Sequence, residues 1–121
     1  LPIGNTAAGA NLYIGIIGGP LVVSMRSIKN DKIELAKKIS EKYPLAHGSP
    51  VHWHDPADIG IQDINKPDWG DPAPVKKDET PVFWACGVTP QVSLMRAKLE
   101  MSITHKPGQM LITDLPENSQ Q

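Results

Sequence analysis

The chain has 121 residues, enough for one domain with a modest hydrophobic core. Its formal net charge of −1 gives no basic excess, which argues against nucleic acid or an acidic membrane surface as a partner. A single cysteine cannot form an internal disulfide, so the fold is expected not to depend on oxidation.

The first regular elements expected are two buried strands. Residues 1–11 are small and irregular in pattern, whereas residues 12–17 and 21–25 are nearly continuous apolar runs of strand length. Gly18, Gly19 and Pro20 separate the two runs, so the whole stretch is too short and too broken to span a membrane. The chain begins with leucine, and we expect it to be processed or to be part of a longer product.

Residues 31–42 carry the clearest helical pattern. Asp31 and Glu34 match a capping box at the start of this helix. Its apolar face is predicted to consist of Ile33, Ala36, Ile39 and Tyr43.

A proline-rich stretch follows the helix and extends to Pro81. Long regular elements are not expected there, apart from a short strand at residues 51–54. The stretch nevertheless keeps apolar residues such as Ile59, Ile61 and Ile64, in which disordered linkers are poor. We therefore predict an ordered, irregular loop layer.

Residues 81–91, PVFWACGVTPQ, predict a strand, a turn and a helix in immediate succession. Residues 82–86 form the strand, Gly87 allows the turn, and Thr89 and Pro90 match an N-cap and the first helical position. The helix is expected over residues 90–98, with Val92, Met95 and Leu99 facing inward. Such a junction exposes backbone N–H groups that bind anions and lower the pKa of a nearby thiol.

The rest of the chain predicts two short strands, residues 102–105 and 110–113, around a turn at residues 106–108, and a fraying end at residues 117–121. Strands combined with two main helices indicate a mixed α/β domain, with a mixed sheet and the proline-rich loop layer.

Several segments, taken in order, resemble the D-glutamate cyclase family, also described as YcsI-like hydro-lyases. They are LVVSMR at residues 21–26, HGSPVH at 47–52, PDWGD at 67–71, PVFWACGVTPQ at 81–91 and ITHKPG at 103–108. The resemblance covers residues 19–114 and corresponds to the C-terminal half of a family member, with a divergent segment before it and a flexible tail at residues 115–121. Two positions depart from the family pattern: His54 stands within a motif that commonly reads His-Ile-Gly-Asp, and Gln109 replaces a second histidine.

The resemblance implies ring closure of D-glutamate to 5-oxo-D-proline with loss of water, without a cofactor. The implied partner is a small acidic, amino-acid-like substrate, and no nucleic acid or membrane. A homo-oligomer or a missing N-terminal half is a further expectation, because an exposed apolar face would need to be covered. Bacterial members are cytoplasmic, and animal members lie in the mitochondrial matrix.

Lactam formation requires a group that moves protons, and histidine is suited to this role near neutral pH. The catalytic candidates are His47, His52 and His105, which lie in loops rich in proline and glycine, and Cys86 as a nucleophile. The alternative is that the histidines are hydrogen-bonded loop residues and Cys86 a small buried side chain.

The reaction also requires a clamp for carboxylate and a site for a developing oxyanion. Arg26 would bind carboxylate through its bidentate fork, unless it forms a structural salt bridge or is simply exposed at the strand end. Ser24, in the same motif, and Gly87 and Thr89, at the helix start, complete the substrate-binding candidates.

Two rival functions follow from the same residues. The chain could be a non-catalytic carboxylate-binding fragment, which Gln109 and the length of the chain favour. It could also be a metal-dependent hydrolase that uses His52, His54 and Asp55, although two histidines and an adjacent acid are a weak metal signal and we predict no metal site.

Overall fold

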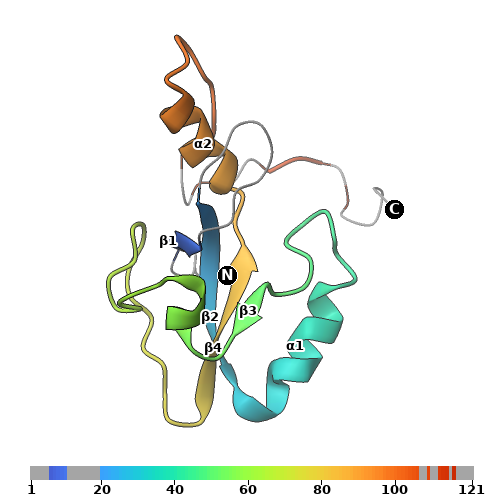
Figure 1. Ribbon diagram of the computed structural model, residues 1–121. Coiled ribbons are helices and arrows are strands. Elements are labelled where there is room, and N and C mark those ends of the chain that lie inside the picture. Colours follow the sequence, from blue (N-terminus) through green and yellow to red (C-terminus); the bar gives the residue numbers. More distant parts are fainter. Residues whose placement is uncertain (1–5, 11–19, 107–108, 110–111, 115, 117–121) are drawn as a thin grey trace.

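A four-stranded antiparallel sheet forms the centre of the computed structural model, which describes residues 6–10, 20–106, 109, 112–114 and 116. The strands are β1 (Thr6–Ala10), β2 (Leu21–Lys29), β3 (His52–Trp53) and β4 (Glu79–Ala85), in the spatial order β1-β2-β4-β3 (Figure 1). The mixed α/β class is confirmed. All three pairings are antiparallel, so the sheet itself is antiparallel rather than mixed.

Two strands differ from the sequence prediction at their ends, because cross-strand pairing holds residues that have little strand propensity of their own. β2 continues through Lys29 and β4 begins at Glu79, since these two residues are cross-strand partners at the end of one long ladder. β1 occupies part of the stretch expected to be irregular, and its small residues form a strand by pairing with β2. The predicted strand at residues 12–17 lies outside the described residues.

One face of the sheet carries the hydrophobic core. Leu21, Val23, Met25 and Phe83 lie on this face, because alternate residues of a strand point to the same side. Ile61 is buried against them, and Ile59, Ile64 and Ala73 pack around this cluster. The proline-rich stretch is therefore an ordered layer over the sheet, as predicted (Figure 1).

Helix α1 (Ile33–Ser40) packs on the opposite face, after a short 3-10 turn, η1 (Asn30–Lys32). The indole N–H of Trp84 donates to the Ser40 hydroxyl at 3.2 Å, which ties the end of the helix to β4. The Lys37 ammonium lies 3.3 Å from the centre of the Trp53 ring, a cation–π contact that ties the middle of the helix to β3.

The predicted capping box at the start of this helix is wrong. The helix begins two residues after Asp31, its N-cap is Lys32, and no side chain caps it. Glu34 instead accepts from Lys37 at 2.7 Å, one turn along the helix. The predicted apolar face is only partly packed, since Ile33 is buried while Ile39 and Tyr43 are 50% and 43% exposed.

Helix α2 (Thr89–Ala97) follows β4 as predicted, but its attachment differs. Its N-cap is Val88 rather than Thr89, because the Thr89 side chain bonds to β2 instead. Met95 and Leu99 are exposed, so the prediction that they face inward is wrong. Residues 102–105 form no strand, while the predicted strand at residues 110–113 falls partly, and the fraying end at 117–121 wholly, outside the described residues.

No helix in the described part of the chain combines the length and the apolar character that a membrane span requires.

Candidate functional site

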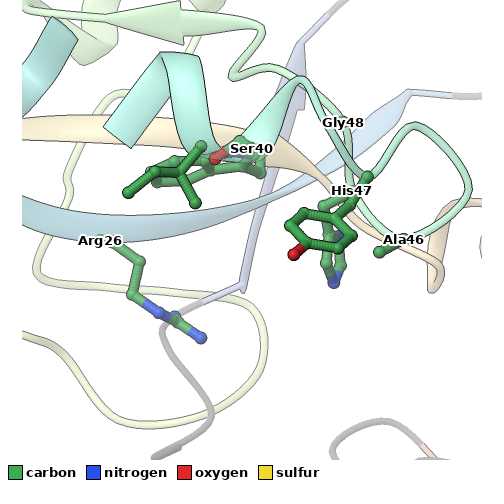
Figure 2. Close-up of a pocket in the computed structure, with 8 residues that line it drawn as sticks. Arg26, Ser40, Ala46, His47 and Gly48 are labelled. Carbon is green, nitrogen blue, oxygen red and sulfur yellow. The ribbon is translucent and has the colours of Figure 1, made fainter. Parts of the chain in front are cut away.

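A pocket of about 320 Å³ opens on the α1 side of the sheet, where the end of α1 meets β2 and β4. Its lining residues are Arg26, Ile39, Ser40, Tyr43, Ala46, His47, Gly48 and Trp84. Figure 2 shows the Arg26 guanidinium and the His47 ring pointing toward the same open side. The pocket thus brings together one predicted carboxylate clamp and one predicted proton-transfer group.

Arg26 enters the pocket from β2 and is half-buried. Its Nη1 donates to the carbonyl of Met25 at 3.1 Å. No carboxylate among the described residues forms an ion pair with it, so the structural salt bridge considered as the alternative is not found there. Burial lowers the pKa of Arg26, and interaction with the Cys86 sulfur partly offsets this. The guanidinium remains charged at neutral pH and keeps donors for an anion.

His47 is held by the loop that follows α1. The carbonyl of Tyr43 accepts from the N–H groups of Ala46 and Gly48, both at 3.1 Å, and Gly48 has a φ of +62°, which glycine adopts without strain. The His47 Nδ1 lies 2.8 Å from the carbonyl of Ala85 on β4. A carbonyl only accepts, so Nδ1 carries the proton and Nε2 of the neutral ring is the free acceptor. The contact fixes the tautomer that a general base needs.

A second pocket, of about 600 Å³, adjoins the first, because Ala46 and His47 line both. Cys86, Gly87 and Thr89 line it at the junction between β4 and α2. Arg26 and these three predicted residues therefore line two neighbouring pockets, and His47 belongs to both.

The Thr89 side chain mainly joins α2 to the sheet. Its Oγ1 accepts from the N–H of Val22 at 2.9 Å and lies 3.2 Å from the carbonyl of the same residue. The Val22 carbonyl also accepts from the N–H of Cys86 at 2.9 Å, and the Thr89 N–H donates to the carbonyl of Cys86 at 3.1 Å. These bonds fix the turn around Gly87, where an added Cβ would meet nothing within 4 Å and a ligand therefore has room.

The remaining predicted site residues lie elsewhere. His52 pairs with Phe83 and so belongs to the sheet face opposite Arg26, where its Nε2 lies 2.8 Å from the carbonyl of Asp55. His105 is exposed, and its Nδ1 lies 2.9 Å from the carbonyl of Lys106. Ser24 is half-buried beside Trp84 and lines neither pocket.

The His52, His54 and Asp55 group does not form a metal-binding arrangement. The Asp55 carboxylate accepts from the N–H of Ala57 at 2.9 Å and caps the short 3-10 helix η2 (Pro56–Ile59). The described residues contain no group of three or more histidine, cysteine or acidic side chains placed to hold a metal ion. The geometry therefore lends no support to the metal-dependent hydrolase.

Sequence reasoning missed three lining residues, Ser40, Tyr43 and Trp84. The sequence pattern places Tyr43 on the apolar face of a helix and Trp84 within a strand, and neither position marks a pocket. The one signal in the sequence is the spacing of Tyr43, four residues before His47, which is compatible with both residues lying in one turn.

Comparisons with known proteins identify the relatives of this chain. The family model for D-glutamate cyclase matches residues 7–114, beginning before the first sequence motif. Curated relatives bear the name "Putative hydro-lyase": one from Dinoroseobacter shibae is 58% identical over 106 residues, covering 88% of this chain and 35% of the relative. One from Bradyrhizobium is 58% identical over 101 residues, 84% of this chain and 37% of the relative. One from Methylobacterium radiotolerans is 47% identical over 125 residues, 95% of this chain and 46% of the relative. The chain thus spans less than half the length of these relatives.

Proposed function

The chain belongs to the D-glutamate cyclase family, and we propose that it carries the carboxylate clamp and the proton-transfer group of a hydro-lyase that closes D-glutamate to 5-oxoproline. One observation carries the proposal: the half-buried cation of Arg26 has no carboxylate partner in the described part of the chain and shares a pocket with His47. A half-buried charge with spare donors favours binding of an anion.

The proposed chemistry assigns each group one task. Arg26 binds the α-carboxylate of the substrate through its fork, which orients the amino group toward the γ-carboxyl carbon. His47 takes a proton from the ammonium at Nε2, so that nitrogen can attack this carbon and form the new C–N bond. The nitrogen loses two protons in all, and both reach the departing γ-oxygen, which leaves as one water when its C–O bond breaks.

Cys86 has a second proposed role, as a nucleophile: its sulfur bonds to the γ-carboxyl carbon as the γ-oxygen leaves as water, and the amino nitrogen then displaces the thiol to close the ring. Its place in the adjoining pocket, which shares His47 with the pocket of Arg26, supports this route. Replacement of Cys86 by serine separates the routes. Direct attack by nitrogen survives the change, whereas a thioester route is lost.

A second candidate is a domain that binds carboxylate without catalysis. The matched stretch covers only 35–46% of the relatives named above, so groups that complete the reaction in those relatives can lie outside it. In this candidate function Arg26 still binds carboxylate, but His47 transfers no proton.

One experiment tests both candidates. The purified chain is incubated with D-glutamate, and 5-oxoproline is quantified by chiral chromatography and mass spectrometry against buffer alone and against L-glutamate. Turnover that falls in Arg26→Gln and His47→Asn, but not in His105→Asn outside the pockets, supports the hydro-lyase. Binding of D-glutamate without turnover supports the second candidate, and absence of both contradicts the proposal.

A further inference from the structure

Helix α2 and the segment after it form an arm with little support from the rest of the molecule. We define the arm as residues 89–105. The side-chain amide of Gln91 donates to the carbonyl of His105 at 2.9 Å, so the segment after α2 turns back along the helix. Figure 1 shows the helix and the following turn projecting beyond the end of the sheet.

The arm exposes large apolar side chains. Met95 is 77% exposed, and the exposed fractions of Leu99, Met101 and Ile103 are 53%, 79% and 91%. No residue of α2 is buried. Monomeric proteins rarely leave such side chains clustered in water, and clusters of this kind mark contact surfaces.

The helix also needs packing to be stable. α2 has nine residues, and isolated helices shorter than about 12–15 residues are marginal in water. Its hydrogen bonds to the sheet run through Thr89 at its first turn, residues 91–94 are only half-buried, and residues 95–97 are exposed. Because the two sheet faces are already covered by α1 and by the loop layer, the arm is the surface left for a further layer of structure.

We infer that the arm docks against the polypeptide region that the relatives possess outside the matched stretch. The relative from Dinoroseobacter shibae matches this chain at 58% identity, yet the match covers only 35% of that relative. The arm offers an apolar surface against which the remaining residues of that relative can pack. Thr89, Pro90, Ser93 and Leu94 of α2 also line the larger pocket, so a layer on the arm lies beside the candidate site. The inference does not rest on the proposed reaction.

The test expresses this chain, with an affinity tag, together with the unmatched region of the Dinoroseobacter shibae relative as a second polypeptide. We expect the two to co-purify as a one-to-one complex, measured by light scattering. Ile103→Asp places a charge in the interface and lowers the affinity by roughly tenfold to a hundredfold, as expected for loss of one buried aliphatic side chain. Leu35→Asp is the matched control, because Leu35 is 50% exposed on α1, away from the arm.

A second measurement reports the solvent exposure of the arm directly. Peroxide oxidises exposed methionines, so in the free chain Met95 and Met101 should react quickly and the buried Met25 slowly. In the complex Met95 and Met101 should become protected. The inference is overturned if the wild-type chains do not co-purify or if Ile103→Asp and Leu35→Asp behave alike. It is equally overturned if the free chain already protects both methionines, or does so only as its own concentration rises, which would identify a second copy as the occupant.

Discussion

Replacement of Arg26 by glutamine should weaken ligand binding without weakening the fold. The guanidinium is half-buried, donates to the carbonyl of Met25, and has no ion pair among the described residues. Glutamine retains a donor and removes the charge, so the protein no longer has to desolvate a cation. We expect the free energy of unfolding to change by less than about 1 kcal/mol, as for substitutions that break no buried network.

The loss of binding should be much larger. Hydrogen bonds to charged groups contribute about 1.5–3 kcal/mol each, so the affinity for D-glutamate or 5-oxoproline should fall roughly tenfold to more than a hundredfold. Calorimetric titration measures the affinity and urea unfolding measures the stability, with Arg96→Gln as an exposed control on α2. Unchanged affinity together with a loss of about 3–5 kcal/mol in stability would refute the reasoning, because that is the signature of a broken buried ion pair.

Three further predictions concern the groups around the site. Thr89→Val leaves the buried N–H of Val22 without its acceptor, so urea unfolding should show a loss of about 1–3 kcal/mol. The Ser27 hydroxyl, followed by the Lys76 N–H, holds the pKa of Glu79 below its ordinary value of 4.5. The stability that charged Glu79 contributes is thus present above pH 4.5 and lost as pH falls through the lower folded pKa, and thermal unfolding of Glu79→Gln should lack this acid-dependent part. His47→Asn keeps an N–H donor for the carbonyl on β4, so 5-oxoproline should still bind while turnover, measured by chromatography, falls by about 10²–10⁴.

The sequence predicted local features better than attachments between elements. The strand, turn and helix around Gly87 were found because apolar runs, glycine and proline act locally. The role of Thr89 was missed because its hydroxyl bonds to Val22, which lies far away in the chain and becomes a neighbour only when the sheet forms. Helical periodicity likewise marked Met95 and Leu99 as one face, but periodicity carries no information on what that face packs against.

The candidate site was predictable in its residue types and not in its grouping. Arg26 and His47 were both expected from the needs of lactam chemistry, and the structure places them in one pocket. His52 was expected with equal reason, but its pairing with Phe83 places it on the opposite face of the sheet. A shift of one residue in the pairing register moves every side chain of a strand to the other face of the sheet. No local signal in the sequence fixes that register.

Nuclear magnetic resonance provides the most direct test of the central claim that the Arg26 and His47 pocket receives the carboxylate substrate. With labelled protein, titration with D-glutamate should shift the side-chain Nε–H signal of Arg26 and the ring signals of His47, and leave the ring signals of His52 and His105 in place. Shifts confined to His52 or His105, or no saturable shift in any of the four side chains, would contradict the account.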